Sequence, residues 1–104
     1  MSSTAKFQPG QIVDHLRFGY RGVIVDVDAV FSLSDEWYDT VAKSRPPKDQ
    51  PWYHVLVDNA LHTTYVAERH LALSSNLTQI AHPELGRFFC RFDNGRYYST
   101  RDAS

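Results

Sequence analysis

The chain has 104 residues, of which 42% are hydrophobic, and its formal net charge is -1. This length predicts one domain, 1–104, and the hydrophobic content excludes an intrinsically disordered chain. The near-neutral charge argues against a strongly basic nucleic-acid-binding domain, although it leaves room for a local cluster of cations on one face.

The single cysteine, Cys90, limits the possible chemistry. One thiol forms no internal disulfide and excludes a zinc site that needs two or more thiolates from this chain, which fits a reducing compartment. Its place in the apolar run FFC predicts a packed, inert thiol. The first ten residues contain no apolar run like that of a signal peptide, and no stretch approaches about 18 apolar residues. We therefore expect a cytoplasmic protein without membrane spans.

The N-terminal third predicts two strands. Residues 1–6 are polar and are expected to fray, and Pro9-Gly10 marks a turn before a short strand at 11–15. A second strand begins at residue 23 and follows a period of two. Its expected faces are Val23, Val25 and Val27 on one side and Ile24, Asp26 and Asp28 on the other. A face with two aspartates is solvated, which predicts a half-buried strand.

Residues 34–51, SDEWYDTVAKSRPPKDQP, form a long connection between strand-like runs. Ser34 is a favourable N-cap, and the acidic residues that follow it suit the positive end of a helix dipole. We expect one short helix over roughly 35–43, ended by Pro46 and Pro47. Connections longer than about 12–15 residues are uncommon in compact domains and are often functional.

The second half predicts a meander of short strands. Residues 52–58 read as a strand, and Asp58-Asn59 turns it into an antiparallel partner at 61–67. Asn94-Gly95 between aromatic residues predicts a further hairpin. Five or six short strands with little helix indicate a small antiparallel barrel or sandwich. Because side chains fill a barrel of this size, we expect no ligand cavity and a function carried by the exterior.

The sequence contains no recognisable catalytic motif. None of the five histidines lies in a G-x-S-x-G or H-E-x-x-H pattern. Asp26 and Asp28 are better explained as a solvated strand face than as an acid–base pair, and His54 with His62 makes an incomplete metal site. We therefore expect a protein that is not an enzyme and uses no cofactor or metal.

Two kinds of binding surface stay open on the residues alone. Arginines interleaved with Phe and Tyr in the C-terminal run would suit a stacking platform for nucleic acid, but they equally describe an ordinary hairpin. Trp37 and Tyr38 are useful anchors for a protein partner. The alternative is that they cover one open end of the barrel.

Four blocks of the sequence closely resemble a known family. KFQPGQIVDH, GYRGVIVDVD, DQPWYHVLVD and TTYVAERHL match, in order and spacing, the YccV-like hemimethylated-DNA-binding family, whose bacterial members include heat-shock protein Q. The resemblance covers nearly all of residues 6–73. HPELGRFFCRF, at 82–92, is similar to the end of this domain as it occurs in larger eukaryotic F-box proteins, whereas short bacterial members often end in a polar tail.

The resemblance implies a non-enzymatic, SH3-like β-barrel that self-associates as a trimer. It implies two activities: preferential binding to hemimethylated double-stranded DNA, and action with the Lon protease in the turnover of selected or denatured proteins. For phosphate contacts we expect Arg17, Arg21, Lys43, Arg45 and Lys48. For a protein partner we expect Trp37, Tyr38, Pro46 and Pro47. The near-neutral charge favours the protein-interaction role, with DNA binding as the alternative.

Overall fold

The computed structural model describes residues 5–99, and an antiparallel sheet of five strands forms their centre. The order of the strands in this sheet is β4-β3-β2-β1-β5. The strands are β1 (Ile12–His15), β2 (Arg21–Asp28), β3 (Trp52–Val57), β4 (Thr63–Ala67) and β5 (Leu71–Leu73). The predicted hairpin between β3 and β4 is confirmed, with Asn59 at a positive φ of 60° in its turn.

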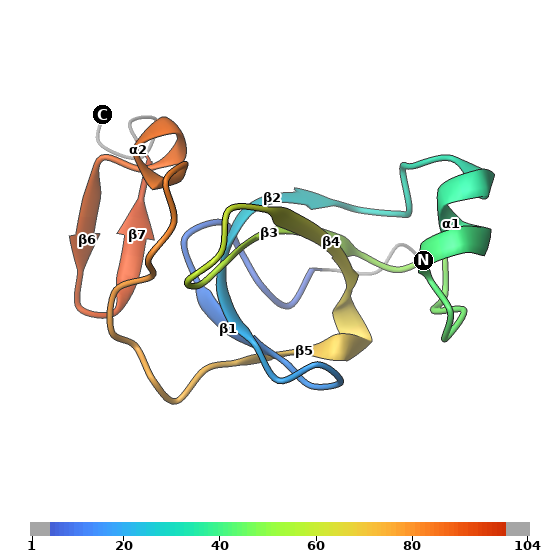
Figure 1. Cartoon of the computed structure of the whole chain (residues 1–104), viewed down its shortest axis with the longest axis horizontal. Coiled ribbons are helices and arrows are strands. Elements are labelled where there is room, and N and C mark those ends of the chain that lie inside the picture. Colours follow the sequence, from blue (N-terminus) through green and yellow to red (C-terminus); the bar gives the residue numbers. More distant parts are fainter. Residues whose placement is uncertain (1–4, 100–104) are drawn as a thin grey trace.

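The sheet curls on itself, so that Figure 1 shows it almost end-on as a ring. The 3₁₀ helix η1 (Glu68–His70) carries the chain from β4, at one edge, to β5, at the other. Within residues 5–99 no ladder joins these two edge strands. The mostly β, antiparallel architecture is confirmed, but a closed SH3-like barrel is not.

The alternation predicted for the second strand is wrong in its middle. The register between β2 and β3 shifts between Ile24 and Asp26, which marks a β-bulge. As a result Val27 packs with Ile24 inside the ring, whereas Val23 and Val25 pack on the outer face. The bulge inserts one residue into the alternation, and the valines at 23 and 27 therefore end on opposite faces.

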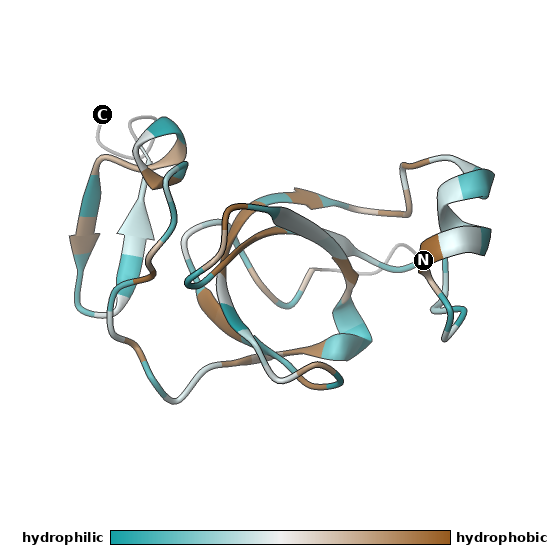
Figure 2. Ribbon diagram, in the orientation of Figure 1, coloured by the Kyte–Doolittle hydropathy of each residue, from teal (hydrophilic) through white to brown (hydrophobic). Residues whose placement is uncertain are grey.

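The inner face of the ring holds the first core cluster. Tyr53, Val13 and Ile24 are fully buried there, and Phe7 covers the cluster from the N-terminal side. Figure 2 shows hydrophobic residues along the strands that enclose this cluster. The backbone N–H of Lys6 donates to the buried carboxylate of Glu68 at 2.9 Å. Of the residues expected to fray, 5 and 6 are thus anchored, and 1–4 lie outside the described part.

A C-terminal unit covers the outer face of the same sheet. It consists of α2 (Leu85–Phe88), β6 (Arg91–Asp93) and β7 (Arg96–Tyr98) and lies at the left of Figure 1. Phe89 and Tyr97 of this unit pack with Ile12, Val23 and Leu56 of the sheet in a second core cluster. The two faces of β1–β3 are therefore both buried, which explains why these strands are apolar on both sides.

Two backbone positions allow the C-terminal unit to approach the sheet. The Asn94-Gly95 hairpin is confirmed, with φ values of 54° and 81° that favour these two residue types. Gly10 has a φ of 96°, and a Cβ atom there would lie 2.1 Å from the carbonyl oxygen of Tyr97. Gly10 also donates to Ile24 and accepts from Tyr97 through its backbone.

The thiol of Cys90 is exposed, so the prediction that it is packed is wrong. Phe89 turns toward the second core cluster, and Cys90 follows it immediately before β6. Adjacent residues in extended backbone point to opposite sides, which places the thiol outside. Among residues 5–99 no helix has the length and apolar content needed to cross a bilayer.

The long connection folds as a separate lobe, at the right of Figure 1. Its helix, α1 (Asp35–Val41), begins at Ser34, whose Oγ accepts from the N–H of Trp37 at 3.1 Å. The predicted short helix is confirmed, and it ends slightly earlier than expected. Phe31 N–H donates to Lys48 carbonyl oxygen at 2.9 Å, which closes the base of the lobe. We call residues 29–51 the α1 lobe.

Candidate binding groove

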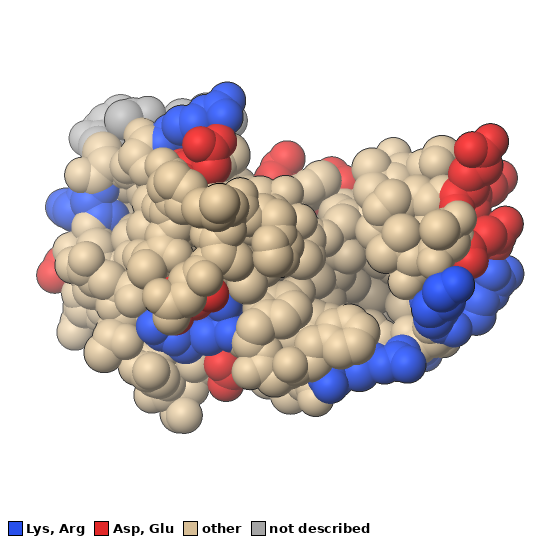
Figure 3. All heavy atoms as spheres, in the orientation of Figure 1, with Lys and Arg blue, Asp and Glu red and all other residues tan. Residues whose placement is uncertain are grey.

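A groove of about 720 Å³ lies between the α1 lobe, the β1–β2 turn and strand β4. The prediction of no ligand cavity concerns the interior of the ring, and this groove does not test it, because the groove lies beside the ring and is walled by the inserted lobe. The groove lies on the exterior, where we expect the function. Figure 3 shows the hollow between the body of the molecule and the lobe.

The wall on the lobe side is built from stacked aromatic rings. Trp37 packs edge-on against Trp52 and Tyr65, with ring centroids 6.0 and 5.6 Å apart. Trp52 stacks on Tyr65 at 5.2 Å and is almost fully buried. Phe31 contacts all of these rings and Tyr38. Aromatic pairs at these distances stabilise packing by about 0.5–1.5 kcal/mol beyond the burial of area, so the wall is preorganised.

Tyr65 fixes this wall to the sheet through its hydroxyl group. The hydroxyl donates to Asp28 Oδ2 at 2.7 Å and accepts from the N–H of Ser32 at 3.1 Å. Burial and the hydrogen bond to Asp28 raise the pKa of Tyr65 to about 12. Tyr65 therefore stays protonated at neutral pH and holds the start of the α1 lobe against β4.

The opposite wall is the β1–β2 turn, which is organised by His15. The Nδ1 atom of His15 accepts from the backbone N–H groups of Arg17 and Phe18 at 3.1 and 3.0 Å. Its ring stacks on Phe18, with centroids 4.7 Å apart. Burial, and after it the charges of His70 and Arg17, lower the pKa of His15. A neutral imidazole is what these two accepted hydrogen bonds require.

Ser44 and His70 connect the two walls at one end of the groove. Ser44 Oγ lies 2.9 Å from His70 Nε2, and Arg69 donates to the carbonyl oxygen of Ser44 at 2.8 Å. His70 stacks in turn on His15, with ring centroids 5.7 Å apart. Burial, followed by the charges of Arg69 and Arg17, lowers the pKa of His70. Ser44 and the two imidazole rings thus close the end of the groove, and burial favours the neutral form of both rings.

The charge of the groove is one-sided. Its lining includes Arg17 and Lys43 and contains no Asp or Glu. Figure 3 shows Lys and Arg side chains gathered on the lower flank of the α1 lobe, while Asp and Glu lie on the upper part of its outer edge. The apolar lining therefore meets solvent at a positive rim, which suits an apolar ligand that carries negative charge.

The five cations predicted to contact phosphate do not form one surface. Arg17 and Lys43 lie at the groove. Arg45 pairs with Asp39 at 2.8 Å and Lys48 with Asp35 at 3.0 Å, and both cations also cover the ring of Tyr38. These exposed pairs stabilise the lobe weakly, and they neutralise much of its positive charge.

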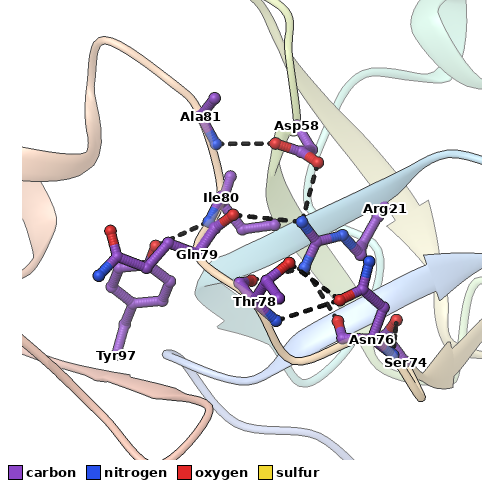
Figure 4. Close-up of polar contacts among 9 residues, drawn as sticks. All are labelled: Arg21, Asp58, Ser74, Asn76, Thr78, Gln79, Ile80, Ala81 and Tyr97. Carbon is purple, nitrogen blue, oxygen red and sulfur yellow. Dashed lines mark hydrogen bonds and ion pairs between the residues drawn. The ribbon is translucent and has the colours of Figure 1, made fainter.

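Arg21, the fifth predicted cation, lies away from the groove in a structural network (Figure 4). Its guanidinium pairs with Asp58 at 3.0 Å and donates to the carbonyl oxygens of Asn76, Thr78 and Gln79. Its side chain is only 14% exposed. Because its donors are occupied in this way, Arg21 is not part of the candidate binding surface.

The residues predicted for a protein partner divide into two groups. Trp37 lines the groove, and Pro47 is exposed. Tyr38 is 5% exposed, and its hydroxyl donates to the carbonyl oxygen of buried Pro46 at 2.7 Å. Tyr38 therefore acts as the core of the α1 lobe, although Pro46 also reaches the groove lining.

Sequence reasoning missed Phe18, Tyr65 and the whole of β4 as groove residues. Phe18 is 70% exposed beside the turn residue Gly19, and a large aromatic residue in a turn was a usable indication. Tyr65 and β4 gave no such indication, because their place in the groove depends on how the α1 lobe folds back on the sheet.

One cluster has the composition of a metal site. Side-chain atoms of Asp26, Asp28 and His54 lie within 4.8 Å of one another, and the β-bulge helps to bring them together. His54 Nε2 already lies 3.1 Å from Asp28 Oδ2, which also accepts from Tyr65. Asp28 and His54 thus belong to a hydrogen-bond network that orients Tyr65, while Asp26 Oδ1 accepts from the N–H of Val27. His54 pairs with Tyr65 across the β3–β4 ladder and His62 lies beyond Thr63, so the two histidines are not cross-strand neighbours.

The curved antiparallel sheet with its lateral groove places the chain among small, mostly β proteins. A family model described as "Hemimethylated DNA-binding protein YccV like" matches residues 5–96. The chain therefore belongs to the YccV-like family. The match includes the C-terminal unit through the start of β7.

Proposed function

We propose that the chain is a non-enzymatic, cytoplasmic heat-shock protein that captures exposed segments of denatured or selected proteins and acts with the Lon protease in their turnover. The aromatic groove carries this proposal. The Lon partnership comes from the family resemblance, and the groove supplies a surface that such a role needs.

The lining of the groove suits a polypeptide better than a duplex. Trp37, Phe18 and Tyr65 present rings to the groove, and such rings are the anchors that contribute most at protein interfaces. A duplex presents a convex, charged backbone that needs a surface of unpaired cations. Two of the predicted cations, Arg45 and Lys48, are instead paired with acidic residues of the lobe.

A degradation assay tests this function directly. Purified Lon, ATP and an unfolded substrate are combined with the chain, with Trp37→Ala, or with Arg87→Ala as a control on the C-terminal unit. We expect the chain to accelerate turnover, Trp37→Ala to lose at least half of the acceleration, and Arg87→Ala to keep it. Equal acceleration by Trp37→Ala, or none by the intact chain, would refute the proposal.

Binding to hemimethylated duplex DNA is the second candidate. The family description favours it, and the guanidinium of Arg17 lies over the exposed ring of Phe18, 5.7 Å from its centroid. An exposed apolar ring beside a cation is a suitable reader of a methyl group in the major groove.

Titrations with hemimethylated and unmethylated duplexes at several salt concentrations test the second candidate. Affinity should fall with salt by a slope of about -0.9 for each neutralised phosphate. The two duplexes should differ by about 1 kcal/mol or more, as for one lost base contact. Equal binding at physiological salt would eliminate recognition of the methyl group.

Self-association as a trimer stays a prediction, based on the family resemblance. Sedimentation equilibrium of the intact chain measures it directly: a mass near three times 12.0 kDa is expected, and the mass of a monomer would refute it.

A further inference from the structure

Strand β4 runs along the groove as an unpaired edge of the sheet. All five of its residues, Thr63 to Ala67, line the groove. β3 pairs with one side of β4, and within residues 5–99 no strand pairs with the other side. An unpaired edge presents backbone donors and acceptors to any extended chain that reaches it.

The hydrogen bonds that flank β4 show which backbone groups face the groove. Val57 N–H donates to His62 O at 3.4 Å, and Glu68 N–H donates to Pro51 O at 3.1 Å. The register between them is continuous, and hydrogen-bonded pairs alternate along an antiparallel ladder. Thr64 and Val66 therefore bond to β3, whereas Thr63, Tyr65 and Ala67 direct their N–H groups toward the free edge.

The two faces of β4 lead to two different apolar walls. Tyr65 points to the side of Trp37 and the α1 lobe. Thr64 points to the other side, where its Oγ1 lies 2.7 Å from the hydroxyl of Tyr20 behind the β1–β2 turn. A strand laid along β4 would alternate its side chains between these walls. Edge and walls together have the geometry for strand addition.

The charge of the rim selects among extended chains. Arg17 and Lys43 line the groove, and its lining contains no Asp or Glu. His15 and His70 also line it, and because their pKa values are lowered, their neutral forms are favoured. The side chains of an added strand that reach the rim are therefore favoured when they are acidic and opposed when they are basic.

We propose that the groove binds an extended polypeptide segment as an additional strand on β4, and that it selects apolar segments flanked by acidic residues. This inference rests on the proposed capture of unfolded proteins and specifies how they are held. Main-chain hydrogen bonds to the N–H groups that face the groove supply affinity that does not depend on the sequence of the bound segment. The two walls and the rim supply the preference for apolar segments with acidic flanks.

A strand of the length of β4, five residues, spans about 17 Å at 3.4 Å per residue. Such a short recognition element fits denatured proteins of many sequences, since it requires only a brief apolar run in extended form. It also explains why an edge strand is left open here, although open edges promote aggregation and are usually protected. The α1 lobe and the β1–β2 turn shield this edge from larger structures.

The test uses the intact chain and a labelled peptide with a Val-Tyr-Val-Tyr-Val core flanked by two Glu residues on each side. Amide hydrogen exchange is measured by NMR with and without a saturating amount of peptide. We expect exchange at Thr63 and Tyr65, whose N–H groups face the groove, to slow at least tenfold, and exchange at Thr64 and Val66 to change far less. Equal or no protection at the two sets would overturn strand addition.

Two peptide controls and one pair of variants complete the test. A peptide with N-methylated core amides should bind at least tenfold more weakly, as should the same core flanked by Lys. Thr63→Pro, which removes an N–H that faces the groove, should weaken binding at least threefold relative to Thr63→Val, which keeps it. Unchanged affinity for the N-methylated peptide would overturn strand addition while leaving capture by the groove intact.

Other outcomes separate the inference from the function on which it rests. Failure to bind either charged peptide would overturn both proposals. Strand-like protection without any effect on turnover by Lon would support the inference and refute the proposed function. Protection of Tyr65 that rises with protein concentration in the absence of peptide would instead identify a second copy of the chain as the occupant, and would overturn the inference.

Discussion

The C-terminal unit and the α1 lobe flank the same sheet at opposite ends, and they are attached to it in different ways (Figure 1). The C-terminal unit is held by an apolar cluster and by a polar network in which Arg21 and Asp58 bind the backbone of residues 76–81. The α1 lobe is held mainly by aromatic rings and by a few hydrogen bonds, which include those made by Ser32 and Ser44.

This difference separates a structural interface from a binding surface. The C-terminal unit covers the outer face of β1–β3. Hydrogen bonds from Arg21 and Asp58 hold residues 76–81, the segment that leads to this unit. The α1 lobe packs against the sheet near Trp52. Farther from Trp52 the lobe and the sheet separate, and the groove lies between them. Segments that carry binding are commonly loops positioned by a rigid scaffold, and the lobe fits that arrangement.

Arg21→Met should produce the largest loss of stability. The substitution leaves Asp58 and three carbonyl oxygens without their shared donor in a site where both charged side chains are about 85% buried. Breaking a buried pair costs about 3–5 kcal/mol, and we expect about 2–4 here because some solvent reaches the pair. Urea unfolding measures this loss. A loss below 1 kcal/mol would mean that the network does not hold the C-terminal unit.

Arg87→Met is the matched control on the same unit. Arg87 pairs with Glu84 within one helical turn, and its side chain is 73% exposed. Exposed pairs contribute about 0–1 kcal/mol, so this variant should unfold almost like the parent chain.

Tyr38→Phe should have an intermediate effect and should act on the α1 lobe. It removes the hydroxyl that donates to Pro46 O, while the buried ring remains. Loss of one such bond, with a buried acceptor left unpaired, costs about 1–3 kcal/mol. Urea unfolding should show this loss, and peptide affinity should fall because the wall of the groove loosens. Unchanged stability would show that the hydrogen bond from Tyr38 to Pro46 does not hold the lobe.

Acidification should loosen the β1–β2 turn. The pKa of His15 lies below the ordinary value of 6.5, so the unfolded chain takes up its proton first as the pH falls. The stability contributed by neutral His15 is complete above pH 6.5 and declines as the pH falls through the lowered pKa. His70 acts in the same direction. Unfolding midpoints at pH 7.5 and 5.5 should differ less for His15→Gln than for the parent; an equal difference would contradict the assignment.

Asp39→Asn should have the smallest effect of the series. It removes the Arg45–Asp39 pair, in which both side chains are more than 60% exposed. We expect a change within about 0.5 kcal/mol in urea unfolding. A larger loss would show that ion pairs, rather than aromatic packing, hold the outer part of the lobe.

Local features of the fold could be predicted from the sequence. The cap at Ser34, the Asn94-Gly95 hairpin and the β3–β4 hairpin depend on residues close together in the chain, and each is present as expected. The bulge in β2 could not be predicted in this way. An alternating pattern is read along one strand, whereas a bulge is a feature of how β2 pairs with β3.

The candidate site was less predictable for the same reason. Trp37 and Lys43 were identified by residue type and lie at the groove. Arg21 was chosen as a cation beside a turn, but its role depends on carbonyl oxygens more than fifty residues away in the chain. The groove itself is formed by three segments distant in sequence, and no pattern within any one of them indicates it.

Intrinsic fluorescence tests the central claim most directly, because both tryptophans of the chain, Trp37 and Trp52, line the groove. Titration with a permanently unfolded polypeptide lacking tryptophan should shift or quench their emission in a saturable manner, and Trp37→Ala should weaken the binding at least fivefold. If the polypeptide binds, as measured by anisotropy of a label on it, while the emission stays unchanged and Trp37→Ala binds like the parent, the groove is not the binding surface.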